Sequence, residues 1–172
     1  SLGDRFTLTA GLRYSDENKD FDQLLDRVSG TTGLSLPGFP VRYLREGKYE
    51  AWTPKLGPQF QATDDVMLYA SATRGFKSGG FNFSSANAIH GYGPETLWSY
   101  EAGFKSDLAD NRVRLNGSVF QYDYKDLQVQ AFITPGVTDI TNASDAEVKG
   151  VELELQARPT DALSLGATLN YL

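Results

Sequence analysis

The sequence predicts an all-β protein built as an antiparallel, up-and-down sheet, and two observations support this. First, apolar and polar residues alternate over stretches of about ten residues, as expected when the side chains of a strand point alternately to opposite faces. Second, three very short polar connections alternate with three long loops. Such a rhythm is typical of a transmembrane β-barrel, whose short turns face the periplasm and whose long loops face outside. We therefore predict a segment of about seven strands from such a barrel.

The first and last strands show the alternation most clearly. From Phe6 to Tyr14 every second residue is apolar, and residues 163–171 repeat the pattern. Residues 151–157 alternate as clearly, and further strands with weaker face assignments are predicted near residues 49–62, 66–76, 97–107 and 112–125, each strand paired with the next. Within 112–125 the apolar face changes, since Val113, Leu115, Gly117 and Val119 lie on one side and Phe120, Tyr122 and Tyr124 on the other. We interpret this change as a bulge or as aromatic residues near the membrane interface.

The strand at 151–157 places Glu152, Glu154 and Gln156 on one face, opposite Val, Leu and Ala side chains. Two carboxylates and an amide on one face require a wet environment. The solvent side of a soluble sheet would provide it, and so would the hydrated interior of a large barrel.

The connections have two characters. The short ones contain turn-forming residues whose side chains bond nearby backbone groups: Thr63-Asp64-Asp65, Leu108-Ala109-Asp110-Asn111 and Pro159-Thr160-Asp161. By contrast, the stretch from Asp16 to Lys48 is long and rich in Gly and Pro, so we predict an irregular loop with a functional role or with disorder. Any helix is expected only within residues 16–48 or 77–94.

Composition excludes several classes of protein. No stretch reaches the roughly eighteen apolar residues of a membrane-spanning helix. Cysteine is absent, which excludes disulfides and thiolate metal sites, and the formal charge of -6 argues against a nucleic-acid partner. No phosphate-binding glycine loop, Ser-His-Asp set or zinc pattern is found, so we expect neither an enzyme nor a cofactor. Both ends look cut, because no signal peptide precedes the first strand and the chain stops within the last one.

Six ordered segments carry a family resemblance. They are Trp52–Gly57 leading to Thr63–Asp65, Leu68–Ser71 running into Arg74–Asn82, Glu95–Lys105, Phe120–Gln128, Asn142-Ala143 with Lys149–Glu154, and Leu169-Asn170-Tyr171. On these segments the chain resembles the middle-to-late barrel of a TonB-dependent outer-membrane receptor.

The resemblance implies a bacterial outer-membrane barrel of about 22 strands with a plugged lumen. Receptors of this family import scarce nutrients such as ferric siderophores or cobalamin, with energy passed to the plug by the TonB protein. Residues 1–172 would then be one partial barrel domain, with the plug and the barrel closure absent. The implied partners are outer-membrane lipid, TonB through that plug, and a ferric siderophore or similar nutrient.

Candidate ligand-binding residues cluster after the strand at 66–76. Arg74 and Lys77 offer cations to an acidic ligand, although a basic and aromatic interface anchor followed by a flexible Gly79-Gly80 turn is the simpler interpretation. Three aromatic residues of the same loop offer stacking surfaces, with an interfacial belt as the alternative: Phe81, Phe83 and Tyr92. His90 is the only histidine, and a single imidazole cannot hold a metal alone, so a solvated loop position is the simpler interpretation.

Two alternative functions remain open from sequence. A passive porin or an outer-membrane adhesin shares the strand rhythm but lacks the family segments. A soluble β-sandwich binding module needs bulky inward faces to close a core, whereas Ala10, Ala157 and Ala167 make the apolar faces here lean.

Overall fold

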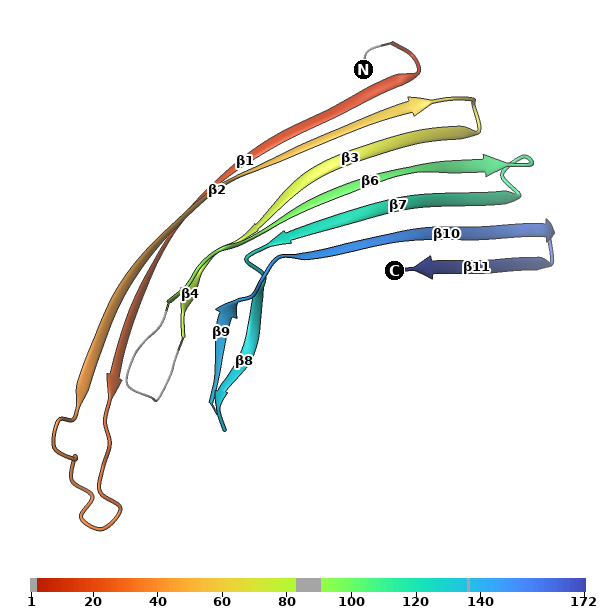
Figure 1. Cartoon of the computed structure of the whole chain (residues 1–172). Coiled ribbons are helices and arrows are strands. Elements are labelled where there is room, and N and C mark those ends of the chain that lie inside the picture. Colours follow the sequence, from red (N-terminus) through yellow and green to blue (C-terminus); the bar gives the residue numbers. More distant parts are fainter. Residues whose placement is uncertain (1–2, 83–90, 136) are drawn as a thin grey trace.

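A computed structural model describes residues 3–82, 91–135 and 137–172. These residues form strands and no helix. They therefore contain no helix that is long and apolar enough to cross a membrane. Seven strands make one antiparallel sheet, with each member paired to the next along the chain (Figure 1). They are β1 (Phe6–Leu25), β2 (Val41–Gln61), β3 (Val66–Lys77), β6 (Glu95–Leu108), β7 (Val113–Lys125), β10 (Ala146–Thr160) and β11 (Leu163–Tyr171). The predicted fold class, number of strands and order are thereby confirmed.

The predicted short turns lie together at one end of the sheet (Figure 1). Four residues separate β2 from β3 and β6 from β7, and two separate β10 from β11. In the β6–β7 turn Ala109, Asp110 and Asn111 all have positive φ, between 54° and 64°. Asp and Asn tolerate this left-handed backbone because their short polar side chains bond locally.

The prediction of an irregular loop between Asp16 and Lys48 is wrong for most of that segment. β1 and β2 continue through it in an unbroken register from Phe6↔Phe60 to Leu25↔Val41, leaving residues 26–40 as the connection. The extension is hard to recognise because both of its faces are polar and the apolar alternation therefore ends. Charged pairs on the hairpin, such as Arg42 with Asp22, accompany the ladder there.

Two further hairpins fill the other long connections. β4 (Gly80–Phe81) pairs with β5 (Gly91–Tyr92), and β8 (Gln128–Thr134) pairs with β9 (Val137–Asn142). Both lie beyond the end of the main sheet that is opposite to the short turns, with β4–β5 beside the β1–β2 extension and β8–β9 beside β4–β5 (Figure 1). Neither hairpin was predicted.

The bulge considered for β7 is also wrong. Its register with β6 and with β10 is continuous from Val113 to Tyr124. The aromatic residues of its second half therefore truly face the side opposite to Val113–Val119. A register shift does occur in the sheet between Ala157 and Thr160 of β10, opposite β11.

The sheet has one apolar face and one polar face. The register shows this, because residues that are paired across neighbouring strands lie on the same face. One row crosses all seven strands with apolar residues: Phe6, Phe60, Leu68, Phe104, Gly117, Leu153 and Leu169. The neighbouring row on the other face is almost entirely polar: Thr7, Gln59, Tyr69, Gly103, Ser118, Glu152 and Asn170. We call these the outer face and the inner face.

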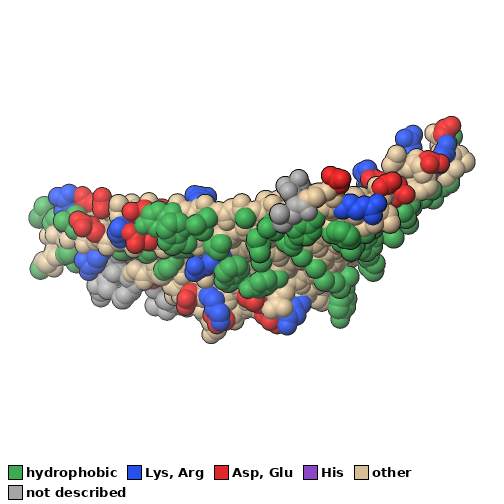
Figure 2. Space-filling model, turned by 90° about the horizontal axis from the view of Figure 1, so that it is seen from above, with side chains coloured by type: hydrophobic (Ala, Val, Ile, Leu, Met, Phe, Trp, Pro, Cys, Tyr) green, Lys and Arg blue, Asp and Glu red, His purple; other side chains and the backbone are tan. Residues whose placement is uncertain are grey.

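The described residues enclose no conventional hydrophobic core. Ala51 is the one buried hydrophobic residue in the described ranges, whereas Leu165 and Leu169 of the outer face are 53% and 60% exposed. Charged side chains gather at the end of the sheet that bears the short turns (Figure 2). A single layer with exposed leucines cannot be a β-sandwich, whose two sheets must bury their facing sides. Lipid is the environment in which such a face is stable.

Candidate ligand-facing surface

The inner face carries a polar cluster at mid-sheet. Tyr69 donates its hydroxyl hydrogen bond to Glu101, and the Lys105 ammonium lies 5.7 Å from the centre of the Tyr69 ring. Nearby, Asn116 Nδ2 donates to Glu154 Oε2 at 3.2 Å. A concavity of about 420 Å³ lies over this cluster. The cluster offers hydrogen-bond donors and acceptors to water or to protein segments in the barrel interior, and no nucleophile paired with a base.

Above this cluster, towards the long loops, the inner face becomes aromatic. Phe120 and Tyr122 of β7 stack with ring centres 4.9 Å apart, and Tyr124 follows on the same face. The β7 register places Tyr122 opposite Ser99 and Tyr124 opposite Leu97 of β6. We call Phe120, Tyr122 and Tyr124 the aromatic ladder. The sequence shows the change of apolar face within this strand, but these three residues were not predicted as part of a site.

Lys77 lies at the outer end of the same face. It pairs in register with Glu95 at the start of β6, and its side chain is exposed. The Glu95 carboxylate accepts a hydrogen bond of 2.7 Å from the backbone N–H of Gln128. The Lys77 side chain is thus exposed at the mouth of the inner face, and its contact with an acidic ligand stays a prediction.

Phe81 and Tyr92 belong to the β4–β5 hairpin, which packs on the β1–β2 extension. The Phe81 ring lies 5.8 Å from that of Phe21. Lys19 Nζ donates to Ser78 Oγ at 2.5 Å and to Gly79 O at 2.8 Å, and lies 5.6 Å from the centre of the Tyr49 ring. The hairpin is therefore held in place by the extension.

Glycine is required at positions 79 and 80 because Tyr92 lies too close to both residues to leave room for a side chain. A Cβ at Gly79 would lie 2.3 Å from the Tyr92 carbonyl oxygen, and one at Gly80 would lie 2.6 Å from the Tyr92 hydroxyl. Neither glycine has a positive φ, so the flexible turn expected from sequence is replaced by tight packing.

Two asparagines connect the β4–β5 hairpin to the β8–β9 hairpin. Asn82 donates from Nδ2 to Ile140 O and accepts from Ile140 N, both at 2.7 Å. Asn142 accepts from Gly93 N at 2.6 Å and donates to Gly93 O at 3.0 Å and to Asp126 O at 2.8 Å. Gln128 adds bonds of 3.0 Å to Ser78 O and Gly93 O. The side-chain amides of these residues thus join the two hairpins, in the way that backbone hydrogen bonds join neighbouring strands.

Arg74 occupies a different place from the other candidates. Its register partner is Trp98, on the outer face, and its guanidinium lies 3.4 Å from the Trp52 carbonyl oxygen, to which it donates. Tyr14 and Trp52 pack nearby with ring centres 4.7 Å apart. Arg74 is therefore placed as an interfacial anchor beside aromatic residues.

Phe83 and His90, the remaining candidates, lie outside the described residues. Over the part of the chain that is described, no three His, Cys, Asp or Glu side chains are grouped to hold a metal ion.

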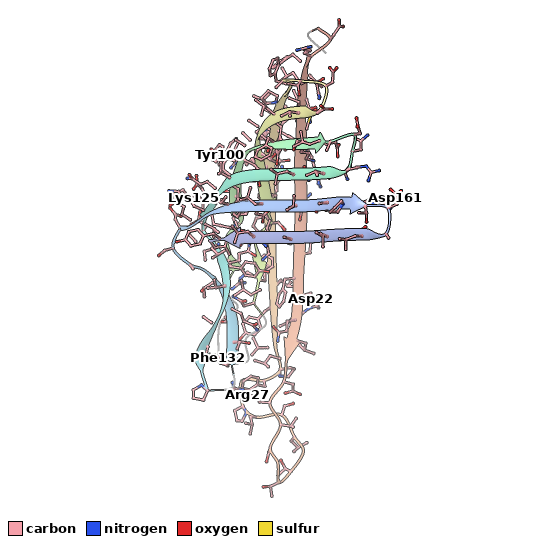
Figure 3. All side chains as sticks on the ribbon, turned by 90° about the vertical axis from the view of Figure 1, so that its right-hand side faces the viewer. Asp22, Arg27, Tyr100, Lys125, Phe132 and Asp161 are labelled. Carbon is pink, nitrogen blue, oxygen red and sulfur yellow. The ribbon has the colours of Figure 1, made fainter. Side chains whose placement is uncertain are left out.

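Ion pairs mark the extension beyond the apolar band. Asp22 and Arg42 form a two-bond pair, and Arg42 holds the pKa of the Asp22 carboxyl below its ordinary value. Arg27 and Phe132 lie well below Asp161, which sits in a short turn (Figure 3), and the β1–β2 extension and the short turns lie at opposite ends of the sheet (Figure 1). The charged extension and the short turns thus lie at opposite ends of the apolar band, as in a barrel that crosses a bilayer.

A curved antiparallel sheet with a lipid-compatible outer face, a polar inner face, short turns at one end and long loops at the other defines a segment of an outer-membrane barrel. The family model described as "TonB dependent receptor-like, beta-barrel" matches residues 1–172. The chain belongs to this family, whose members are transport receptors of the bacterial outer membrane.

Two curated relatives are similar in sequence. The metal-pseudopaline receptor CntO of Pseudomonas aeruginosa is 31% identical over 122 residues, which are 71% of this chain and 16% of the relative. The pesticin receptor of Yersinia enterocolitica is 27% identical over 159 residues, which are 91% of this chain and 22% of the relative. The chain therefore spans less than a quarter of the length of either relative.

Solved structures share the fold. The ferric yersiniabactin uptake receptor FyuA from Yersinia pestis superposes with a TM-score of 0.79 at 24% identity, covering 98% of this chain and 24% of that receptor. The copper transporter OprC superposes with a TM-score of 0.70 at 20% identity, covering 98% of this chain and 27% of the transporter.

Proposed function

We propose that this chain is part of the barrel of a TonB-dependent receptor that imports a scarce metal chelate, such as a ferric siderophore, across the outer membrane. The carrying observation is the pair of opposite faces established by register over all seven strands, in a chain that belongs to this receptor family. The names of two similar proteins, a metal-pseudopaline receptor and a ferric yersiniabactin uptake receptor, support a metal chelate as the cargo.

The whole receptor needs more than these strands. In the sheet β1 and β11 each have one neighbour. Backbone groups at such edges must be paired within lipid, because each unpaired group costs several kcal/mol. We propose that residues 1–172 form one partial barrel domain, that further strands close the barrel to about 22, and that a plug outside this segment contacts TonB.

The ligand-facing surface combines a cation with aromatic rings at the mouth of the inner face. Lys77 supplies the cation, and the aromatic ladder with Phe81 and Tyr92 supplies stacking surfaces. Metal chelates of this kind are commonly anionic and flat in part, so attraction to a cation and stacking on rings both favour binding. Arg74 is left out of this surface because its register position lies on the outer face.

The test uses the full-length receptor in a Gram-negative host that lacks its own chelate receptors. Uptake of radiolabelled ferric and cupric chelates is measured with and without TonB, and we expect saturable uptake that requires TonB. In the same host, Tyr122→Ala should weaken chelate binding about tenfold, equivalent to about 1.4 kcal/mol. Tyr100→Ala, which removes a tyrosine from the outer face, serves as the matched control. Solute passage that is unsaturable and independent of TonB would instead identify a passive porin.

A further inference from the structure

Two residues between β3 and β4, Ser78 and Gly79, belong to no strand and are held from two sides. Lys19, on the inner side of the β1–β2 extension, donates from Nζ to Ser78 Oγ at 2.5 Å and to Gly79 O at 2.8 Å. Gln128, the first residue of β8, donates from Nε2 to Ser78 O at 3.0 Å. All three oxygen atoms of the two residues thus accept hydrogen bonds from side chains at least 50 residues away in the sequence. We call Lys19 and Gln128 the clamp.

Packing supports the clamp on the side of the extension. The Tyr49 ring lies against Gly79, where a Cβ would come within 2.4 Å of Tyr49 Cε1. The Phe81 ring lies in the same way over Gly47, where a Cβ would be 3.1 Å from Phe81 Cζ. The two glycines therefore let the β4–β5 hairpin approach the extension closely enough for Lys19 to reach it.

Gln128 holds both ends of the β4–β5 hairpin. Besides its bond to Ser78, which precedes β4, its Nε2 donates to the oxygen of Gly93, which follows β5, at 3.0 Å. Its own position is fixed separately, because its backbone N–H donates to the Glu95 carboxylate at 2.7 Å. A substitution of the Gln128 side chain can therefore release the hairpin without removing the anchor of β8.

The Lys19 ammonium is occupied by the protein itself. Two of its three hydrogens are donated to Ser78 and Gly79, and the Tyr49 ring lies 5.6 Å from Nζ. By contrast, the Lys77 side chain is exposed directly before the held residues, and Phe81 follows two positions after them. The clamp thus acts on the short stretch of backbone that carries two residues of the proposed ligand surface.

We propose that Lys19 and Gln128 are positioning residues for chelate binding, which hold Ser78 and Gly79 so that Lys77 and Phe81 stay at the mouth of the inner face. Where a clamp bond is lost, part of the receptor population has this stretch displaced, and the chelate binds only the remainder. The half-saturating concentration then rises in proportion to the displaced fraction, whereas the transport of bound chelate is unchanged. The inference rests on the proposed uptake function and assigns a role to two residues that do not contact the chelate.

Trypsin measures the release of the held residues directly. The bond between Lys77 and Ser78 is a tryptic site, and its backbone must leave the clamp to enter a protease, so the cleavage rate follows the displaced population. Cells that carry the full-length receptor are treated with trypsin, and the fragment that begins at Ser78 is measured by mass spectrometry. Lys19→Met removes two hydrogen bonds and keeps the apolar stem, and it should speed this cleavage about tenfold. Gln128→Leu should also speed it, and the double variant should be cleaved fastest.

The chain offers a matched control for each variant. Lys48 lies on the opposite side of the same extension, 3.6 Å from the Asp16 carboxylate, so Lys48→Met removes an ammonium without touching the hairpin. Gln130 Nε2 donates to Thr138 Oγ1 at 3.0 Å within the β8–β9 hairpin, so Gln130→Leu removes an amide that does not reach Ser78. Neither control should change the cleavage rate.

Uptake tests the consequence for binding. With the radiolabelled ferric chelate that the wild-type receptor imports, the double variant Lys19→Met/Gln128→Leu should raise the half-saturating concentration about fivefold or more and keep the maximal rate. Lys19→Arg retains N–H donors, so in the presence of Gln128 it should restore wild-type cleavage and uptake. Heat-modifiable electrophoretic mobility establishes that each variant is folded.

The outcomes separate this inference from the proposed function. Unchanged cleavage after Lys77 in the folded double variant would overturn the clamp. Faster cleavage with an unchanged half-saturating concentration, or a fall in the maximal rate alone, would overturn the positioning role and leave Lys19 and Gln128 as structural residues. A wild-type receptor that imports no metal chelate would refute the proposed function and the positioning role with it, while the cleavage rates would still report whether the clamp exists.

Discussion

Leu155→Arg is the sharpest test of which face meets the lipid. Leu155 lies on the outer face within the apolar run of β10, two residues from Ala157 and four from Val151. Lys149 follows this run towards the long loops and Pro159 towards the short turn, so Leu155 lies in the interior of the apolar band. An arginine at that depth on the lipid face should destabilise the folded barrel by about 2–4 kcal/mol.

The matched control is Gln156→Arg on the inner face. Gln156 Nε2 donates to Glu154 Oε1 at 2.8 Å, so an arginine there retains an acidic neighbour and stays hydrated. Its cost should be well under 1 kcal/mol, as for other exposed charge changes. Both variants of the full-length receptor are compared by urea titration of folding into lipid vesicles, read by heat-modifiable mobility. Equal costs at the two positions would show that the assignment of the faces is wrong.

Three further outcomes are expected. Asn142→Ala should lower protection of the two loop hairpins against hydrogen exchange by about 1–3 kcal/mol, since it removes three hydrogen bonds, whereas Gln130→Ala, on the exposed side of β8, should not. Arg42→Ala should raise the pKa of Asp22, measured by NMR of labelled aspartate. Because Arg42 lowers that pKa in the folded protein, the pair stabilises the extension fully above the ordinary aspartate pKa. This contribution is lost as the pH falls through the lowered pKa of the folded protein, below which wild type and variant should be equally stable. Deleting residues 77–94 from the full-length receptor should abolish uptake and leave the barrel folded; retained uptake would assign this segment a structural role only.

The fold within the membrane could be predicted from sequence because lipid on one side and a polar interior on the other impose a strict alternation. From Leu163 to Tyr171 every residue obeys it, and the predicted strand is confirmed. Where β1 and β2 leave the membrane, both faces become wet and the alternation ends, although the ladder continues to Leu25 and Val41. The pattern thus records the environment of a strand rather than its length.

The candidate surface was predictable in part. The sequence places Lys77 where a strand leaves the membrane and becomes a loop, and Lys77 is the last residue of β3. The aromatic ladder was missed because its residues face the interior, where sequence reasoning expected polar side chains. The change of face within residues 112–125 was the available signal. This change shows that the aromatic residues face the interior only if the register of β7 is continuous. The pairing with β6 and β10 establishes that continuity.

Beyond the membrane, order comes from side-chain amides rather than from strand periodicity. Asn82 pairs with the backbone of Ile140 through both its amide groups, and Asn142 does the same with Gly93. An asparagine amide carries a donor and an acceptor in the same geometry as a peptide group, so it can satisfy a strand edge as another strand would. Each of these asparagines links one hairpin to the next segment without a shared strand ladder. An alternating pattern of apolar residues cannot reveal such a link, which is why the strands within the membrane were predicted and the two hairpins were not.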